Sequence, residues 1–377
     1  MKKKLVPLFR SVVKSGEPML YPVYRNDGTL LASKGLVLTV SQTNTLLEEE
    51  LFTDAYELTS AVNKAQTRED LVDTHKLASP FLRFRQAEEM LQDIYVKPSH
   101  PTNMSKLLTI IGRIQTICQQ MPDAAIAKIF IENIDNYAVQ HALHTAILCN
   151  LTAEYLRWDK EDTKHLIGAS ITMNFSLGMK QNDYHQQSEP LTAEQKVEIA
   201  NHPTESSKCL QVIGIKQKKW LEFVEKHHES IDGTGYPCKL TSKDIPLGAS
   251  ILKLADVYCA KITGRTYRSP IIPSIAARDI FMEKTDNGTS GLIQIFVKIV
   301  GLYPPGCLVK LASNEIGIVT RRGARVDTPV VRAIFNANGS QIVTPMLRNT
   351  EQKPYIVKEI VEMGYIRPDL DLERFWT

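Results

Sequence analysis

Helical periodicity dominates the middle of the chain. Apolar side chains recur every three or four positions in KLLTIIGRIQTICQQM (106–121), HALHTAILCNLTAEYL (141–156) and IPSIAARDIFMEK (272–284), as in helices with one buried face. The pattern begins near residue 83 and ends near residue 300. It predicts an all-α domain over residues 101–300, preceded by a linker or helix over residues 71–100.

The pattern changes on both sides of this domain. Residues 5–40 hold short apolar runs around turn residues such as RNDG, which predict a few small strands, and SQTNTLLEEELF predicts a helix with Ser41 as its N-cap. After YPPG (303–306), short β-rich runs follow at regular spacing: CLVKL, IGIVTR, PVVRAIF, QIVTPML and YIVKEIV. The chain is therefore predicted to be multidomain and mainly α, with a small N-terminal α+β module (1–70) and a small C-terminal β-barrel-like domain (301–377).

Composition and charge are those of a globular protein that does not bind nucleic acid. Of the 377 residues, 43% are hydrophobic and 23% charged, and the formal net charge is only +3. These values are ordinary for a globular protein and argue against nucleic acid as a partner. The basic clusters MKKK, KQKK (216–219) and RRGAR (321–325) are short and hold no aromatic residue, so we interpret them as solvated surface.

The cysteines and the apolar runs indicate where in the cell the protein is located. The six cysteines stand singly, without a CxxC pair, which is typical of reduced thiols in a cytosol. No apolar run approaches the ~20 residues that span a bilayer, and the first residues lack the form of a signal peptide. A cytoplasmic location without a membrane span is therefore expected.

Histidines gather in the middle domain, where seven of the nine lie between residues 141 and 228. Neighbouring side chains on a helix point about 100° apart, so His227 and His228 can reach one metal only if their helix ends there. The glycine-rich stretch from Asp232 supplies such a turn. Because the residue before a proline avoids helical angles, His202 before Pro203 is expected at the mouth of a helix, with its ring exposed.

Two further residues are candidate ligands. His141 lies near the start of a long amphipathic helix, where a surface or hydrogen-bonded core role is the alternative to metal binding. Asp256 lies inside the apolar run ILKLADVYCAKI, where an unpaired carboxylate would cost several kcal/mol. This carboxylate therefore needs a cation, or the backbone N–H groups of a loop.

The order of these residues resembles a known family. His141, His202, His227 with His228, and Asp256 follow one another at intervals of 61, 25 and 28 residues. With HHESIDGTGYP (227–237), ADVYCA and TGRTYR, this series resembles the HD-GYP family of metal-dependent cyclic di-GMP phosphodiesterases, which act in bacterial signal transduction. The resemblance covers residues 130–290 and implies a helical domain that holds metal through these five side chains. The flanking segments also resemble modules found with such domains.

One stretch departs from the family pattern. Family members carry a His-Asp dyad and a lysine in LLHDIGK, whereas this chain has SITMNFSL (170–177), with Met173, Asn174 and Leu177 in place of the His, the Asp and the Lys. In the family, that Asp bridges two metal ions. Two divalent cations about 3.5–4 Å apart repel by about 18 kcal/mol at an effective dielectric of about 20, and bridging anions must offset this repulsion.

The lost dyad changes the expected metal content. Asn174 brings no charge, and the thioether of Met173 is a soft ligand unsuited to iron(II), manganese or magnesium. We therefore expect one divalent transition metal (iron, manganese, zinc or nickel) and no two-metal centre. Its affinity should fall as the pH drops through about 6.5. His144, His165 and His185 could replace the lost ligands, although their spacing does not require it.

Residues that would face a ligand in the family are retained. They are Asp232, Gly233, Gly235, Tyr236 and Pro237 in the loop, and Arg265 and Arg268 in TGRTYR. Arginine forks suit phosphate oxygens. Surface ion pairs explain the arginines equally well, a rigid turn explains the loop, and hydrogen bonds to the backbone explain Glu229.

Two functions from different classes follow. The first is a degenerate HD-GYP protein without catalytic residues, which senses cyclic di-GMP or docks signalling proteins such as diguanylate cyclases. The second is an active metal-dependent cyclic di-GMP phosphodiesterase with an unconventional metal site. Metal content distinguishes them, because two tightly held metals favour the enzyme and one or none favours the sensing module.

Overall fold

The chain divides into two compact units, Met1–Ala78 and Ser79–Thr377. The computed structural model describes residues 5–7, 13, 15–16, 18–19, 22–47, 49, 51–54, 79–131, 136–241, 243–264, 271–282, 290–361 and 371–376. Residues 71–78 of the predicted linker or helix (71–100) fall outside these residues. The two units are described in turn.

The N-terminal unit is a small sheet with one described helix. The antiparallel strands follow the order β1 (Leu5–Pro7), β4 (Phe52–Asp54), β2 (Val23–Tyr24) and β3 (Leu30–Ala32), and helix α1 spans Val40–Leu47. A small core lies between them. The predicted α+β character of this module is confirmed.

The predicted boundaries of α1 are wrong at both ends. Thr39, not Ser41, caps the helix: its Oγ1 accepts from the Gln42 backbone N–H at 3.3 Å, while Gln42 Oε1 accepts from the Thr39 backbone N–H at 3.0 Å. The helix ends at Leu47, and Phe52 pairs with Tyr24 in the sheet. Phe52, which the prediction placed in the helix, therefore belongs to the sheet.

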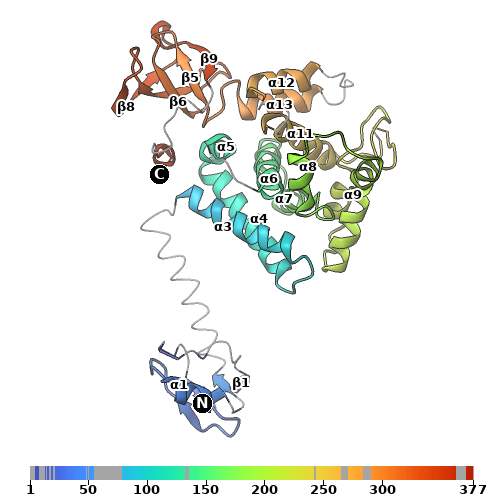
Figure 1. Ribbon diagram of the computed structural model, residues 1–377, viewed down its shortest axis with the longest axis vertical. Coiled ribbons are helices and arrows are strands. Elements are labelled where there is room, and N and C mark those ends of the chain that lie inside the picture. Colours follow the sequence, from blue (N-terminus) through green and yellow to red (C-terminus); the bar gives the residue numbers. More distant parts are fainter. Residues whose placement is uncertain are drawn as a thin grey trace. The chain divides into compact units, whose positions relative to one another are not determined.

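The second unit is mainly helical, as predicted (Figure 1). Its helices are α3 (Pro80–Val96), α4 (Asn103–Gln120), α5 (Pro122–Ile131), α6 (Tyr137–Tyr155), α7 (Lys160–Thr172), α8 (Lys180–Gln186), α9 (Ala193–Val212), α10 (Lys218–Lys226), α11 (Leu247–Ile262), α12 (Pro273–Met282) and α13 (Ser290–Val300). Within the described residues, no helix is both long and apolar enough to cross a membrane.

Helix α6 lies at the centre of this bundle (Figure 1). Its side chains are buried on nearly every face, from Ala138 to Ala153, and it packs against α7 and α11. A helix whose side chains are buried on every face is typical of a protein interior. The polar side chains His141 and His144 are therefore held in the interior by the packing of their neighbours.

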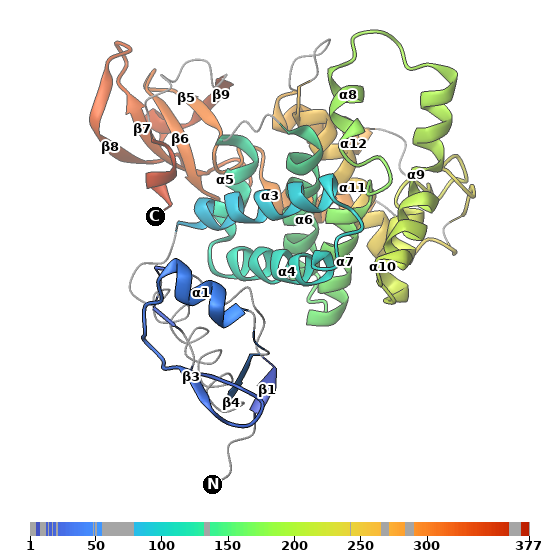
Figure 2. The ribbon, with the colours of Figure 1, turned by 60° about the horizontal axis from the view of Figure 1, so that its bottom comes forward.

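The C-terminal sheet is antiparallel and packs beside α5 (Figure 2). Its strand order is β8 (Gln341–Asn349), β7 (Val330–Phe335), β6 (Ile316–Arg321), β5 (Leu308–Leu311) and β9 (Val357–Val361). These strands match the five predicted runs. The barrel-like shape is not confirmed, because β8 and β9 lie at opposite edges and no pairing of described residues joins them.

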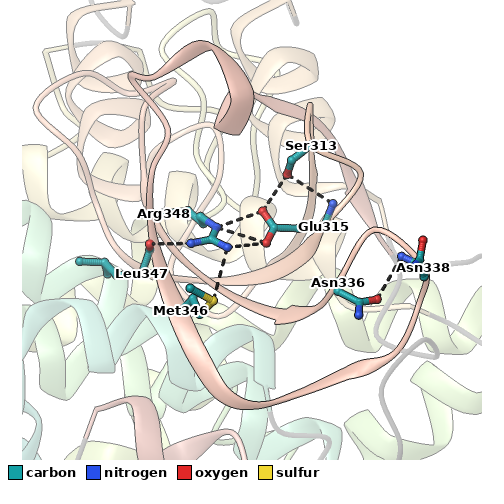
Figure 3. A network of polar contacts seen from close by, with 7 residues as sticks. All are labelled: Ser313, Glu315, Asn336, Asn338, Met346, Leu347 and Arg348. Carbon is teal, nitrogen blue, oxygen red and sulfur yellow. Dashed lines mark hydrogen bonds and ion pairs between the residues drawn. The ribbon is translucent and has the colours of Figure 1, made fainter.

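A buried ion pair fixes the turn between β5 and β6 to strand β8 (Figure 3). Arg348 Nη2 donates to Glu315 Oε1 at 2.6 Å and its Nε donates to Glu315 Oε2 at 3.0 Å, while the Ser313 hydroxyl donates to Oε2 at 2.8 Å. These bonds lower the pKa of Glu315. The fork geometry orients both side chains within the sheet.

Candidate functional site

His202 lies in the middle of a helix, which corrects the prediction of an exposed ring at a helix mouth. Pro203 is inside α9, and its missing N–H leaves the carbonyl of Ile199 without the usual helical donor. The imidazole supplies one instead, since His202 Nδ1 donates to the Ile199 oxygen at 2.6 Å. The ring is buried, with 3% exposure, and its Nε2 points away from the helix backbone.

His227 and His228 lie where α10 ends, as predicted. The helix stops at Lys226, and His227 is its C-cap. His227 Nδ1 donates to the carbonyl of Val224 at 2.6 Å. The ring centroids of His227 and His228 are 4.1 Å apart, so the turn brings both rings to one place.

The three imidazoles form a site that fits one metal ion. A backbone carbonyl can only accept, so Nδ1 carries the proton in both His202 and His227, and Nε2 is a lone pair when these rings are neutral. The two Nε2 atoms face each other at 3.2 Å. Ring nitrogens of His202, His227 and His228 all lie within 4.8 Å of one another. Two nitrogens bound tetrahedrally at about 2.1 Å from zinc are about 3.4 Å apart, so a cation between them resolves the repulsion of the lone pairs.

Burial keeps these histidines neutral. It lowers the pKa of His202 to about 3, and it lowers the pKa of His227 and His228 as well. Protons therefore compete with a metal only at a more acidic pH than for an exposed histidine. The predicted fall in affinity near pH 6.5, which assumes an ordinary histidine, is corrected downwards.

His141 and Asp256 form a second, separate pair. His141 projects from α6 and Asp256 from α11, and Nε2 of the ring lies 2.6 Å from Oδ1 of the carboxylate. Burial alone would raise the pKa of Asp256, but the hydrogen bond and the electrostatic interaction with His141 lower it overall. An ionised Asp256 thus accepts the Nε2 proton of His141. The carboxylate lies in mid-helix, so it does not cap a loop.

The two residues that stand in the positions predicted for the dyad, Met173 and Asn174, lie in different surroundings. Met173 is fully buried in the main hydrophobic core at the end of α7. Asn174 and Leu177 line a cavity together with His141, His202, His228 and Asp256. The amide and the leucine therefore share a cavity wall with four of the five candidate ligands, while the thioether does not line this cavity.

The cavity has a volume of about 560 Å³, which is within the usual size of a small-molecule site. Sequence reasoning missed Tyr137, one of its aromatic residues. Tyr137 and His185 stack with centroids 3.9 Å apart, and Tyr137 also stacks on His141 at 5.2 Å. Of the histidines proposed as substitute ligands, only His185 lines this cavity; His144 and His165 do not. The spacing of Tyr137 four residues before His141 is the one signal that could have found it.

The glycine-rich loop has a clear structural role, and only Tyr236 of it lines the cavity. A Cβ on Gly235 would lie 2.3 Å from the backbone nitrogen of Ser230, so only glycine fits. The exposed Asp232 side chain accepts from the Thr234 N–H at 3.0 Å. Gly233 has a φ of 75°, which favours glycine, and Pro237 follows Tyr236 without lining the cavity.

Glu229 has the backbone role that the sequence suggested. Its two carboxylate oxygens accept from the N–H groups of Cys238 at 2.6 Å and Leu240 at 2.9 Å. Tyr236 stacks on His228 with a centroid separation of 4.5 Å. The loop therefore positions the third histidine. Arg265 and Arg268 lie outside the described residues.

Comparison with known proteins identifies the helical region. An HD domain family model matches residues 126–286. This part of the chain is therefore similar to HD domains. A solved structure titled as an HDG"Y"P protein, Bd1817 from Bdellovibrio bacteriovorus, has a similar fold, with a TM-score of 0.52, 16% identity and coverage of 78% of this chain and 99% of that chain. The predicted resemblance to the HD-GYP family is confirmed.

Curated relatives of this chain are named phosphodiesterases. One from Pseudomonas aeruginosa, a cyclic di-GMP phosphodiesterase, is 26% identical over 71% of this chain and 65% of its own length. One from Borreliella burgdorferi with the same activity in its name is 23% identical over 55% and 54%. A 3'3'-cGAMP-specific phosphodiesterase from Vibrio cholerae is 28% identical over 53% and 45%. The chain thus matches about half to two thirds of the length of these relatives.

The metal content of the purified protein should be about one equivalent of zinc, nickel or iron(II), or less. Elemental analysis of protein prepared without chelators measures this value. His227→Ala should lower it at least about tenfold, because that substitution removes one of three imidazole ligands. His165→Ala is the matched control and should retain the metal. Two equivalents surviving dialysis would reveal ligands outside this set, and an unchanged content in His227→Ala would exclude the cluster as the metal site.

Proposed function

We propose that this chain is a degenerate HD-GYP protein of cyclic di-GMP signalling, which senses a ligand without hydrolysing it. The observation that carries the proposal is Asn174, which lines the cavity with His141 and Asp256. A neutral amide stands there in place of the family's bridging carboxylate. Leu177, in place of the lysine, removes a further charge from the same wall.

The loss of the carboxylate charge at position 174 would impair the attack of hydroxide on the phosphodiester. A hydroxide that bridges two metal ions is acidified and positioned by both, and the cations stabilise the charge that develops on the phosphoryl oxygens. In this chain the three-histidine cluster can hold one metal, whereas His141 and Asp256 bond to each other at 2.6 Å. A single metal at one corner leaves the hydroxide without its second cation.

Ligand binding rests on the cavity and its aromatic walls. The stacked pairs Tyr137 with His185 and His228 with Tyr236 present rings from different elements, and aromatic rings stack well on bases. We further propose that Arg265 and Arg268 contact phosphate oxygens of cyclic di-GMP. The loop residues Asp232, Gly233, Gly235 and Pro237 would support Tyr236 rather than touch the ligand.

Hydrolysis of cyclic di-GMP should be undetectable with added iron(II) or manganese. Chromatographic separation of the products tests this, and calorimetry with the same ligand tests whether binding persists. Tyr236→Ala should weaken binding about tenfold or more, since one stacked base contributes about 1–3 kcal/mol. Sustained metal-dependent turnover that is lost in the double variant His227→Ala, His228→Ala would contradict the proposal, and absence of binding would leave only the docking function.

A second candidate function is an active phosphodiesterase with an unconventional metal site. His185 favours it, because this ring lines the same cavity as His141 and Asp256. If His185 completed a second metal site, His185→Ala would remove both the second metal and the turnover. Under the sensing function, the same variant would leave the metal content unchanged.

The same proposal assigns a role to each predicted domain. The module over residues 1–70 would receive a signal, the linker or helix over residues 71–100 would connect it, the HD domain within residues 101–300 would bind the ligand, and the β domain over residues 301–377 would complete the chain. Docking of a diguanylate cyclase is the alternative output. Pull-down of such an enzyme with and without cyclic di-GMP distinguishes the two.

A further inference from the structure

A second cleft lies between helices α12 and α13 and the loop that follows β6. Its volume is about 1040 Å³, which is large for a small-molecule site. No residue lines both this cleft and the histidine cavity. Figure 1 shows α12 and α13 next to the C-terminal sheet. The cleft is therefore built by both parts of the second unit.

Cations predominate among the charged residues of the cleft. Arg278 on α12, Lys298 on α13, and Arg322 and Arg325 in the loop line it, against the carboxylates of Asp123 and Asp327. Four positive charges thus face two negative ones, which leaves a net charge of +2. A concave surface with one excess sign attracts ligands of the opposite sign.

The guanidinium of Arg322 is fixed in place. It is 29% exposed; its Nε donates to Asp123 Oδ1 at 2.6 Å and its Nη1 donates to the carbonyl of Ile299 at 3.0 Å. These bonds engage Nε and Nη1 of the guanidinium group. This corrects the interpretation of RRGAR as solvated surface, because Arg322 ties the loop to α5 and α13. A planar guanidinium held in this way suits phosphate oxygens.

Arg325 is paired with Asp327 at 2.7 Å, whereas Arg278 and Lys298 are available at the rim. Arg278 is 68% exposed and lies 3.4 Å from Asp279, its neighbour in the helix. Lys298 Nζ lies 5.5 Å from the ring centroid of Tyr155, which is itself 45% exposed. Such exposed contacts are weak. Both long side chains can therefore exchange them for a ligand anion.

The remaining wall is largely apolar. Val297, Val326 and Pro329 line it together with the half-buried ring of Tyr303. A bare phosphate would leave this surface in contact with water. A ligand that joins phosphate groups to a flat heterocycle would cover both parts of the cleft, because rings pack well against apolar and aromatic side chains.

We propose that this cleft binds a nucleoside bearing at least two phosphate charges. The phosphates would contact Arg278, Lys298 and Arg322, and the base would lie against Tyr303 and the apolar wall. A ligand held there would link the C-terminal sheet to α12 and α13. This site does not depend on the function proposed for the histidine cavity.

Fluorescence titration with mant-GDP tests the proposal on the full chain. EDTA is present, so that the histidine cluster carries no metal. We expect saturable binding that inorganic pyrophosphate displaces and guanosine does not. The double variant Arg278→Glu, Lys298→Glu should bind at least about tenfold more weakly, because it replaces two cations that would bond to the phosphates by two anions that repel them. The control Lys216→Glu, Lys218→Glu makes the same change of charge at exposed positions outside the cleft.

The outcomes separate the alternatives. Equal affinity of the wild type and the Arg278/Lys298 variant, or no saturable binding up to about 1 mM, would overturn the proposal. Loss of binding in His228→Ala instead would assign the probe to the histidine cavity and would also overturn it. Binding of hexaglutamate instead of mant-GDP would replace the nucleotide by an acidic segment. If the charge-reversed chain does not fold, Arg278→Gln with Lys298→Gln gives the same test.

Discussion

The double substitution Met173→His with Asn174→Asp should raise the metal content from one equivalent or less towards two. It returns one imidazole and one bridging carboxylate to a frame that keeps His141, Asp256 and the three later histidines. A carboxylate at position 174 offsets part of the repulsion between two cations, which amounts to about 18 kcal/mol at an effective dielectric of about 20. Elemental analysis after dialysis measures the gain.

The two positions contribute differently to this result. Asn174 already lines the cavity, so Asn174→Asp alone should raise metal binding without disturbing the core. Met173 is fully buried among apolar side chains, so Met173→His costs stability unless a metal draws the new imidazole towards the cavity. Met173→Leu with Asn174→Asp is the matched control that keeps the core apolar. A folded double variant with no more metal than the parent would disprove the assignment of the metal ligands.

Activity need not return with the second metal. Leu177 still lacks the charge of the family's lysine, and it lines the cavity wall. Adding Leu177→Lys tests whether that charge limits hydrolysis. Turnover of cyclic di-GMP in the triple variant, and not in the double variant, would assign the remaining defect to this position.

The sequence predicts best which residues are candidate metal ligands and in which order they occur along the chain. The turn at the end of α10 follows from the glycines after Asp232, and the buried carboxylate of Asp256 needs a partner, which His141 supplies. The place of His202 does not follow from the sequence. It depends on the imidazole donating to the Ile199 carbonyl that Pro203 cannot serve, and propensity rules for proline do not include such a side-chain donor.

Tertiary contacts also explain the other differences. The stack of His185 on Tyr137 joins α8 to α6, and no local pattern in either segment indicates it. Arg322 lies in a short basic cluster, yet its partners Asp123 and Ile299 come from distant helices. Strand runs in the C-terminal domain are visible as β-rich segments, but their closure into a barrel depends on edge pairing, which periodicity does not determine.

The metal-free protein should lose much of its stability between pH 7 and pH 4.5. Burial lowers the pKa of His144, His202, His227 and His228 in the folded state, whereas in the unfolded chain each takes up a proton below about pH 6.5. The unfolded state therefore binds more protons, and stability falls as the pH falls. With a folded pKa of about 3, His202 alone accounts for about 2.7 kcal/mol by pH 4.5, at about 1.4 kcal/mol per pH unit.

Urea unfolding in the presence of EDTA measures this loss. Several such histidines together approach the whole free energy of unfolding of a typical domain, about 5–15 kcal/mol, so the midpoint should fall steeply below pH 6. His144→Leu removes one buried histidine that does not line the cavity, and it should reduce the slope by about 1.4 kcal/mol per pH unit. A midpoint that is constant from pH 7 to pH 5 would contradict neutral burial of these rings, and with it the lone-pair geometry on which the metal site depends.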